Sequence, residues 1–306
     1  MIGRVPARIA FIGFGLIGGS IAKALGVEIA GATDSGTGSR PYLTAWTPTG
    51  HGPAQAAADG VIDHAARSLP EVLDGADLVV IAAPALDAIA LVERLGSGLA
   101  QHLTAGAVVT DATSTKRAIT AAAVRSGLPF VGGHPMAGRE MSGYGAAVAE
   151  LFVDRPWVIV IPEGTPPGIS DRVRWLADRC GARPLEMTAA DHDAATGAVS
   201  HLPLVVAAAL VEAVHGEGGD AWRMTRSLAS SGWASATRLA LGDPRMGAGI
   251  LATNGAEVAA GVRALRAALE AWLVELERPE GPNADALERR LAAARAILES
   301  GADDDG

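Results

Sequence analysis

The sequence predicts an α/β fold, a doubly wound parallel sheet of the Rossmann type, followed by an all-α helical domain. The first half alternates helical patterns with short apolar runs rich in Val, Ile and Ala, which are typical of parallel strands covered on both faces. A glycine-rich turn follows the first apolar run. Beyond Pro162 we find almost no strand signal, and helical patterns dominate.

The composition predicts a globular chain of 306 residues, of which 49% are hydrophobic. Lys and Arg number 25 against 34 Asp and Glu, so the net charge is -9 and no basic patch favours nucleic acid. The single Cys180 excludes an internal disulfide and fits a reducing compartment. The run Ile9–Ile12 is too short for a signal peptide or a membrane span. We therefore expect a cytoplasmic protein without a membrane partner.

Six apolar runs are expected to form strands, and the segments between them are expected to form helices. The expected strands are Arg8–Ile12, Leu43–Trp46, Leu78–Ala82, Val108–Thr110, Phe130–Val131 and Trp157–Ile161. The expected helices are Ile17–Leu25, Pro53–Asp59, Asp87–Leu95 and Lys116–Ser126. The stretch EGTPPG at residues 163–168 is typical of a linker. We therefore expect a sheet domain at residues 1–164 and a helical domain at residues 165–306.

The first helix of the expected helical domain has a recognisable start. Thr188 and Asp191 form a capping box, with Asp in place of the usual Glu. The helix is expected to run to about His215, with a kink at Pro203, because proline lacks the N–H that the helix needs.

Two further helices are expected. Asp243, followed by proline, is a typical N-cap for a long Ala-rich helix that runs to about Glu277, and a last helix spans about residues 283–300. Helices this apolar need a partner surface, and the first candidate is another copy of the chain. We expect a homodimer that forms through the helical domain.

The glycine-rich turn has the pattern G-x-G-x-x-G between an expected strand and an expected helix. Gly13 allows the tight turn, Gly15 lets the backbone approach a pyrophosphate, and Gly18 lets the helix pack against the strand. Together with Leu16 and Ile17, these glycines are the expected binding site of a dinucleotide cofactor, NAD or NADP. A glycine-rich turn without a ligand is the alternative.

The choice between NAD and NADP depends on the end of the second strand. An acid there favours NAD, and its absence beside a base favours NADP. Asp34 lies at about the right distance, but the better strand signal, YLTAW, ends at Thr47 without an acid, and residues 28–40 then form an inserted loop. We favour this second interpretation, and with it NADP. Arg40 and His51 are the nearby basic candidates.

A second glycine-rich stretch, VGGHPMAGREMSGYG at residues 131–145, places His134 between two glycines and a proline. The apolar run Leu128–Val131 before it predicts a strand, and strands of an open α/β sheet end at the ligand crevice. An imidazole there can accept or give a proton near neutral pH. We therefore expect the cofactor and His134 to share one crevice.

These motifs together resemble the prephenate/arogenate dehydrogenase family of tyrosine biosynthesis. The resemblance covers most of the chain, and the order and spacing of the motifs are its most specific feature. The motifs are Gly13–Ser20, Asp111–Lys116, Gly133–Gly138 with Ser142-Gly143, His192-Asp193, Ser200–Pro203, and Thr237-Arg238 before Asp243-Pro244. Members of this family join a Rossmann domain to a helical domain that forms the dimer, in agreement with the change of pattern after Pro162.

The resemblance implies an oxidative decarboxylation. A hydride leaves the ring carbon that bears the hydroxyl and passes to the nicotinamide, the ring carboxylate departs as CO2, and the ring becomes aromatic. This chemistry needs a proton acceptor on the hydroxyl, a cation for the carboxylate, and a nicotinamide close to the ring carbon.

The resemblance also assigns roles to single residues. His134 matches the catalytic histidine that polarises the ring hydroxyl, and Ser114 matches the serine that supports it, although Ser114 is also a candidate N-cap for the helix that follows. Arg238 matches the arginine that binds a substrate carboxylate through its planar fork of donors. Ser200 aligns with a serine near the substrate or nicotinamide. Lys116 belongs to the same motif as Ser114, but the sequence assigns it no role.

Two departures from the family pattern bear on the substrate. Prephenate-using members often carry a second histidine in the sequence SHLPH, where this chain has Leu204, which cannot bond a side-chain carboxylate. Segment 247–250 lacks the tryptophan that many members have there. The segment Ser227–Trp233 also resembles that of members that accept arogenate. With Leu204, this places arogenate beside prephenate as a candidate substrate.

The remaining histidines of the motifs give no metal site. His192 and His201 lie nine residues apart, on opposite sides of one helix, so we expect structural roles for both and no bound metal. Two other functions stay open: a different hydroxy-acid dehydrogenase with the same two-domain plan, and a cofactor-binding protein without catalysis.

Overall fold

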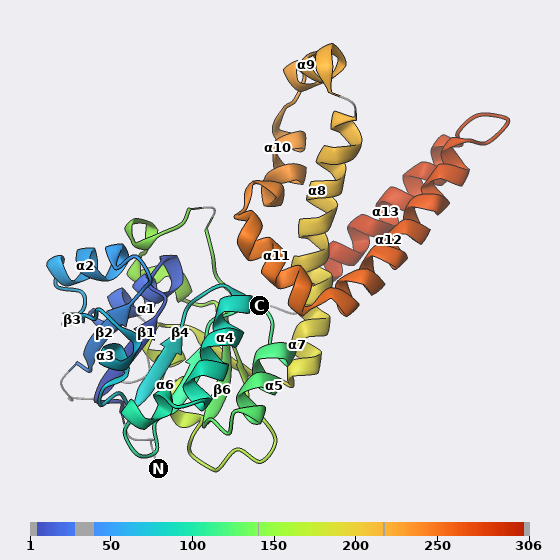
Figure 1. Ribbon diagram of the computed structural model, residues 1–306. Coiled ribbons are helices and arrows are strands. Elements are labelled where there is room, and N and C mark those ends of the chain that lie inside the picture. Colours follow the sequence, from blue (N-terminus) through green and yellow to red (C-terminus); the bar gives the residue numbers. More distant parts are fainter. Residues whose placement is uncertain (1–4, 28–39, 140, 217, 303–306) are drawn as a thin grey trace. The chain divides into compact units, whose positions relative to one another are not determined.

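The computed structural model describes residues 5–27, 40–139, 141–216 and 218–302 (Figure 1). The chain forms two compact units, Met1–Glu257 and Val258–Gly306. The first unit contains the sheet, its covering helices and helices α7 to α11.

Among the described residues, eight strands form one sheet in the order β3-β2-β1-β4-β5-β6-β7-β8. The strands are β1 (Arg8–Ile12), β2 (Tyr42–Trp46), β3 (His64–Ala65), β4 (Leu78–Ile81), β5 (Val108–Asp111), β6 (Phe130–Pro135), β7 (Pro156–Val160) and β8 (Arg183–Glu186). Neighbouring strands are parallel except β6 and β7, which pair antiparallel. The strand order reverses between β1 and β4, where a doubly wound sheet has its ligand crevice.

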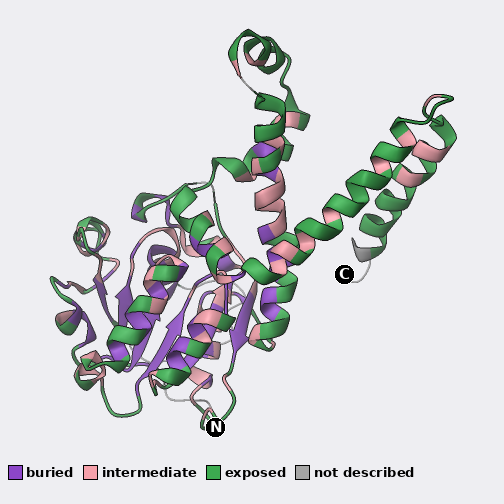
Figure 2. Cartoon of the chain, turned by 45° about the vertical axis from the view of Figure 1, so that its right-hand side comes forward, coloured by how far each residue is buried: buried purple, intermediate pink, exposed green. Residues whose placement is uncertain are grey.

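Helices cover both faces of this sheet. The helices are α1 (Leu16–Leu25), α2 (His51–Ala58), α3 (Leu69–Leu73), α4 (Ala85–Gly96), α5 (Arg117–Arg125) and α6 (Asp171–Arg179). Ile9 and Phe11 of β1 point into a core shared with α1, α2 and α6, while Ala10 and Ile12 point into a second core under α3, α4 and α5. The inner strands, β1, β4, β5, β6 and β7, are accordingly buried along most of their length (Figure 2). This arrangement confirms the predicted doubly wound sheet.

All six expected strands and all four expected helices of the first half are present, with ends shifted by a few residues. The expectation of almost no strand after Pro162 is wrong. β8 pairs with β7, and α6 packs into the core of the same sheet, so the sheet extends past residue 164, where we placed the end of the sheet domain. The residues of β8 are all exposed and include a proline, so they show no apolar alternation that could have predicted a strand.

The helical part begins as the sequence predicts. The helices are α7 (Ala189–Thr196), α8 (Leu202–His215), α9 (Gly219–Ser227), α10 (Ser231–Thr237), α11 (Pro244–Thr253), α12 (Gly255–Leu276) and α13 (Ala284–Ala302). The Thr188 hydroxyl accepts a hydrogen bond from the Asp191 N–H at 3.0 Å, and the Asp243 carboxylate accepts one from the Arg245 N–H at 2.9 Å. Both predicted N-caps are therefore confirmed.

Two interruptions differ from the prediction. Between α7 and α8, residues Gly197–His201 form a π-helical turn, just ahead of the kink expected at Pro203. Proline has no N–H to donate to the carbonyl of Val199, and the chain adapts through this wider turn. The expected single helix to Glu277 is instead two helices, α11 and α12, which break at the buried Asn254.

The run Ala189–His215 has the length and hydropathy of a membrane-crossing helix, with a mean hydropathy of 1.8 and 22% of its window buried. One such helix is weak evidence for a span, because apolar helices of water-soluble proteins meet the same criterion. Its first turns also carry two fully buried polar side chains. His192 bonds to His134 of β6, and Asp193 bonds to the Lys116 N–H at the start of α5.

The turn between β1 and α1 requires glycine at position 13. The φ of Gly13 is +91°, and an added Cβ would lie 2.4 Å from the carbonyl oxygen of Ala82. We expect Gly13→Ala to lower the free energy of unfolding by about 2 kcal/mol or more, from backbone strain and this clash together. Urea unfolding of the cofactor-free chain measures the effect.

Gly232→Ala is the matched control. Gly232 lies in α10 with nothing within 4 Å of the added Cβ, so alanine is expected to leave stability unchanged or raise it by about 0.5–1 kcal/mol. Equal effects of the two substitutions would contradict the strained turn.

Candidate functional site

The predicted cofactor turn connects β1 to α1 as expected. An added Cβ on Gly18 would lie 2.7 Å from the carbonyl oxygen of Gly13, so this glycine lets α1 pack against the turn. An added Cβ on Gly15 would meet its first neighbour, the Gly143 N, only at 4.0 Å, so the turn is open on that side. Gly15 is also the N-cap of α1, and its cap has no side-chain hydrogen bond. Leu16 and Ile17 begin the helix, whose N–H groups suit a pyrophosphate.

The end of β2 also lies where the sequence predicts it. β2 ends at Trp46, and the Thr47 hydroxyl accepts a hydrogen bond from the Gly50 N–H at 3.0 Å in the turn that leads into α2. An added Cβ on Gly52 would lie 2.5 Å from the carbonyl oxygen of Phe14, so α2 begins directly against the glycine turn. The open glycine turn and the start of α1 therefore fit the pyrophosphate of a dinucleotide cofactor.

The predicted role of Arg40 is wrong. Its guanidinium pairs with the Asp63 carboxylate at 2.6 Å, and it precedes β2, at the opposite end of the strand from Thr47. His51 is the first residue of α2 and is exposed. Asp34, the alternative ribose ligand, lies outside the described residues.

His134 lies near the end of β6 and is partly buried. Its Nδ1 is 2.8 Å from His192 Nε2, and His192 Nδ1 is 2.7 Å from Asp193 Oδ1. Burial lowers the pKa of His134 well below its usual 6.5, and the charge of Lys116 and the rings of His192 and His201 lower it further. At neutral pH the His134 ring is therefore uncharged and can accept a hydrogen bond.

Asp193 connects this pair of histidines to α5. Its two carboxylate oxygens accept hydrogen bonds from the Lys116 N–H at 2.7 Å and the Arg117 N–H at 2.9 Å. Burial raises the pKa of Asp193, but the hydrogen bonds from His192 and from these two N–H groups outweigh burial and leave the pKa below its usual value. A carboxylate from α7 thus caps the N-terminus of α5.

The alternative role for Ser114 as an N-cap of α5 is therefore wrong. The helix begins after Lys116 without a side-chain cap of its own, and Asp193 supplies the acceptor. Ser114 lies in the loop between β5 and α5 and is partly buried. Its backbone faces the buried His201 ring and opposes the lowering of the pKa of His201 by burial.

A buried ion pair lies beneath the His134 strand. Lys116 and Asp111 are both fully buried, and the Lys116 ammonium contacts the Asp111 carboxylate and the Thr113 hydroxyl. The other carboxylate oxygen of Asp111 accepts a hydrogen bond at 3.1 Å from the N–H of Gly133, the residue before His134. The sequence assigned Lys116 no role; in the structure it pairs with the carboxylate that bonds the Gly133 N–H of β6.

The expectation that His192 and His201 lie on opposite sides of one helix is wrong. The π-helical turn between them changes the helical phase, and both rings join one cluster. Asn254 Nδ2 donates to the Asp193 carbonyl at 2.7 Å and contacts His201 Nδ1 at 3.0 Å. Among the described residues no group of three or more His, Cys, Asp or Glu is arranged to hold a metal ion.

The other two predicted substrate residues lie on the helical elements. Ser200 is exposed on the π-helical turn, next to the buried His201. Arg238 is exposed and begins a short 3-10 helix, Arg238–Leu241, which packs against α8. Leu204 also lies on α8, 3.4 Å from the position of an added Cβ on Gly247 of α11.

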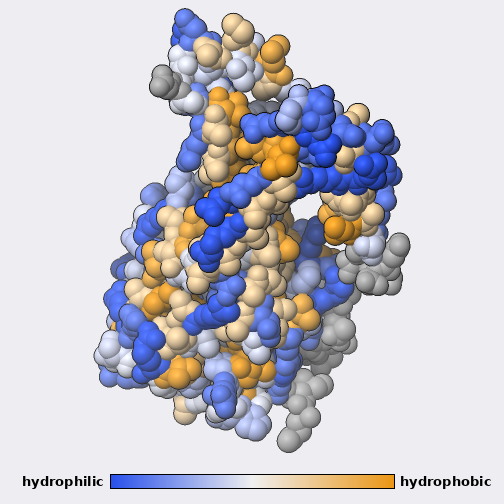
Figure 3. Space-filling model, turned by 90° about the vertical axis from the view of Figure 1, so that its right-hand side faces the viewer, coloured by the Kyte–Doolittle hydropathy of each residue, from blue (hydrophilic) through white to orange (hydrophobic). Residues whose placement is uncertain are grey.

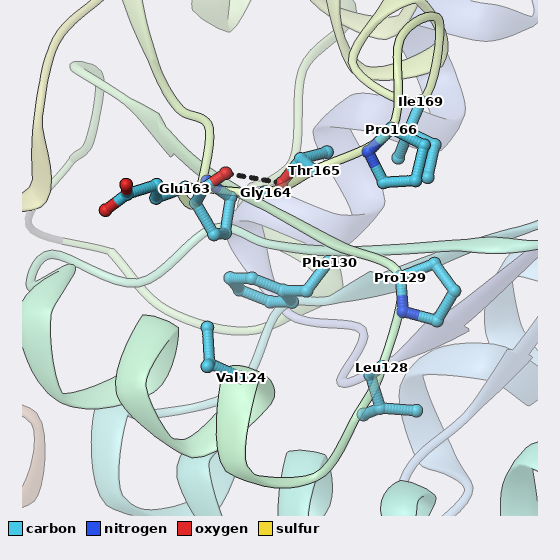
Figure 4. Close-up of a pocket in the computed structure, with 10 residues that line it drawn as sticks. Val124, Leu128, Pro129, Phe130, Glu163, Gly164, Thr165, Pro166 and Ile169 are labelled. Carbon is cyan, nitrogen blue, oxygen red and sulfur yellow. Dashed lines mark hydrogen bonds between the residues drawn. The ribbon is translucent and has the colours of Figure 1, made fainter.

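A surface pocket near the start of β6 is a separate feature (Figure 4). Val124, Pro129 and Phe130 line one side of it, and the loop Pro162–Pro166 lines the other. Phe130 begins β6, whereas His134 lies near its end, so this pocket is at the opposite edge of the sheet from the histidine cluster.

Comparison with known proteins gives the family. Residues 47–185 match the model of the prephenate dehydrogenase nucleotide-binding domain, and residues 188–291 match the prephenate dehydrogenase dimerization domain. The prephenate dehydrogenase of Bacillus subtilis is 32% identical over 260 residues, which are 82% of this chain and 65% of that protein. The cyclohexadienyl dehydrogenase of Zymomonas mobilis is 28% identical over 253 residues, which are 81% of this chain and 80% of that protein.

Solved structures agree with these matches. Synechocystis arogenate dehydrogenase is 28% identical, with a TM-score of 0.76 over 96% of this chain and 99% of that chain. Aquifex aeolicus prephenate dehydrogenase, in complex with hydroxyphenyl propionate and NAD+, is 24% identical, with a TM-score of 0.79 over 95% of this chain and 97% of that chain, and supports the fold. The chain therefore belongs to the prephenate dehydrogenase family, although it spans less than two thirds (65%) of the length of its Bacillus subtilis and Lactococcus lactis relatives.

The buried ion pair gives a testable prediction on stability. Lys116→Met leaves the Asp111 carboxylate buried and unpaired, so we expect the free energy of unfolding to fall by about 3–5 kcal/mol. Combining it with Asp111→Asn removes the unpaired charge, and the double variant is expected to be more stable than Lys116→Met alone. Urea unfolding of the four chains measures the coupling.

The exposed pair Arg125–Glu93, whose charged atoms are 3.6 Å apart, provides the control. Arg125→Met is expected to change stability by no more than about 0.5 kcal/mol. Simply additive losses from the Asp111 and Lys116 substitutions would contradict the proposed pairing.

Proposed function

We propose that the chain catalyses the NAD(P)-dependent oxidative decarboxylation of prephenate or arogenate, which share a ring hydroxyl and a ring carboxylate. The observation that carries this proposal is the His134 ring near the end of β6, whose Nδ1 lies 2.8 Å from His192 Nε2. After His134 the chain leads to Tyr144, whose ring stacks on that of Phe14, between the first two glycines of the turn, with centroids 5.7 Å apart. In this proposal His134 and the cofactor turn belong to one site.

In this proposal His134 accepts a hydrogen bond from the ring hydroxyl through its free Nε2. The hydroxyl oxygen gains positive charge as the hydride leaves its carbon, and the acceptor stabilises that charge. The bond to the ring carboxylate breaks, CO2 departs, and its electron pair completes the aromatic ring. Bound NAD(P)+ supplies the hydride acceptor. The proton stays on the phenol oxygen, so His134 ends the turnover unchanged.

The other predicted residues keep their roles as parts of this proposal. The Arg238 guanidinium binds a substrate carboxylate, and Ser114, whose backbone faces His201, supports the hydroxyl from the β5–α5 loop. Ser200 lies on the adjacent π-helical turn, and such turns are frequent at functional sites.

We also propose that the chain acts as a homodimer through its helical elements. The match to a dimerization domain supports this, and so do large apolar side chains that the single chain leaves exposed there (Figure 3). Leu228 and Leu241 are 80% and 84% exposed in the first unit, and Leu298 is 78% exposed in the second.

The proposed function is tested by the formation of reduced cofactor at 340 nm, with prephenate and arogenate each paired with NAD+ and NADP+. Turnover is expected with at least one pair, and His134→Asn is expected to lower kcat by about two to four decades. Because the pKa of His134 is lowered, the ring loses its acceptor only as the pH falls well below 6.5. The acid limb of kcat/KM is therefore expected below that pH.

His102→Asn is the control, because His102 lies in the short helix Leu99–His102 before β5, away from the ends of the strands where the site lies. Its kcat is expected to match that of the unchanged chain. A folded protein that turns over none of the four pairs would contradict the proposed function.

For the cofactor we propose a preference for NADP. β2 is followed by Thr47-Pro48-Thr49-Gly50, which offers no carboxylate to bond a ribose hydroxyl or to repel a 2′-phosphate. Thr47→Asp places a charge at that point and is expected to lower the ratio of kcat/KM for NADP to that for NAD by about tenfold or more.

Thr47→Asn, which is close in size and uncharged, is expected to keep the preference. If the unchanged chain prefers NAD strongly, or if both variants shift the ratio equally, the assignment of Thr47 to the ribose site fails.

A further inference from the structure

A continuous chain of hydrogen bonds runs from Asp193 through His192 to His134. The two contacts are 2.7 Å and 2.8 Å long, and both His192 and Asp193 have no exposed surface. The rings of His134 and His192 meet edge to face, with centroids 5.1 Å apart and planes at 70°. Fully buried side chains on α7 cannot reach a substrate themselves, so they act through His134.

The chemistry of each atom in this chain sets the position of the protons. The ionised Asp193 carboxylate has only acceptor atoms, so His192 Nδ1 must carry a proton and donate it. In an uncharged His192 ring, Nε2 is then an acceptor. The hydrogen bond between the two rings must therefore be donated by an N–H at His134 Nδ1. A neutral His134 with its proton on Nδ1 presents a lone pair on Nε2.

We propose that Asp193 and His192 are positioning residues that hold the proton of His134 on Nδ1, so that Nε2 can only accept. The inference rests on the proposed function, in which Nε2 takes the hydrogen bond of the ring hydroxyl. The opposite tautomer would present an N–H to the hydroxyl and could not stabilise the positive charge that develops there.

Asp193, at the start of these hydrogen bonds, is held by three contacts besides that to His192, two at its carboxylate and one at its backbone carbonyl. Asp193 accepts from the Lys116 and Arg117 N–H groups at the start of α5, and its own carbonyl accepts from Asn254 at the end of α11. Rotation of the carboxylate would leave the N-terminus of α5 without its acceptor. The tautomer of His134 thus depends on contacts that Asp193 of α7 makes with α5 and with the end of α11.

The charged groups nearby disfavour an imidazolium at His134, which would escape this constraint. Protonation of both ring nitrogens of His134 would create an imidazolium in a cluster that already contains the buried Lys116 ammonium. Burial, Lys116 and the rings of His192 and His201 all lower the pKa of His134. The ring therefore stays uncharged, and its single proton is the one that the chain of hydrogen bonds assigns.

The first test is a measurement on the unchanged chain of 306 residues. Ring ¹⁵N chemical shifts distinguish the two neutral tautomers of histidine, and the signals are assigned by their loss in His134→Asn and His192→Asn. At pH 7, protons on Nδ1 are expected for both rings. A proton on Nε2 of His134 would overturn the proposal even if the enzyme is active, so the outcome is separable from that of the proposed function.

The second test reverses the direction of the hydrogen bonds between Asp193, His192 and His134. In Asp193→Asn the amide can donate to His192 Nδ1, so His192 Nε2 then donates to His134 Nδ1 and the proton of His134 moves to Nε2. We expect the ¹⁵N shifts to report this change and kcat to fall by about two to four decades, with little change in the KM for substrate. Wild-type kcat, or a loss of kcat without a change of tautomer, would overturn the proposal.

Two further variants separate tautomer control from folding. Asp191→Asn changes the same charge two residues earlier, at an exposed site, and is expected to retain kcat and the tautomer. His192→Leu keeps Asp193 as the cap of α5 but breaks the link to His134. Its kcat is expected to fall as in Asp193→Asn, with a mixture of His134 tautomers. Unchanged kcat in His192→Leu would contradict the proposed role of His192 and Asp193 even if Asp193→Asn does not fold.

Discussion

The carboxylate of Asp193 is the group around which the site is organised. It accepts hydrogen bonds from two backbone N–H groups at the start of α5 and from the His192 ring. These bonds connect α7, on which Asp193 lies, to α5. Such a buried anion is stable only with several donors, and here a helix N-terminus and an imidazole N–H supply them. The position of the β5–α5 loop and the orientation of His134 follow from the same bonds.

A second buried anion, Asp111, fixes the strand that carries His134. It accepts from the N–H of Gly133 on one side and contacts the Lys116 ammonium on the other. Lys116 therefore acts on His134 twice, since it allows Asp111 to hold the strand and its charge disfavours an imidazolium. The chemical result is an uncharged hydrogen-bond acceptor at pH 7, as the proposed oxidation of a hydroxyl-bearing carbon requires.

The sequence predicted the sheet well because its inner strands are continuous apolar runs, and the cofactor turn because the glycine spacing has a mechanical reason. It could not predict β3 and β8, of which one has two residues and the other no buried residue. The partnership of His134 with His192 joins residues 58 apart in the chain, and helical periodicity alone placed His192 and His201 apart because it ignored the π-helical turn. The cap of α5 likewise comes from a distant element, so Ser114 was the local but incorrect candidate.

The central claim is that Nε2 of His134 accepts the hydrogen bond of the substrate hydroxyl while Nδ1 stays bound to His192. The most direct measurement is a crystal structure of the chain with NAD(P)+ and the phenolic product of its preferred substrate. The account predicts the phenol oxygen within about 2.6–3.2 Å of His134 Nε2, with the contact to His192 Nε2 retained. A phenol oxygen bound elsewhere, or a His134 ring turned away from His192, would contradict it.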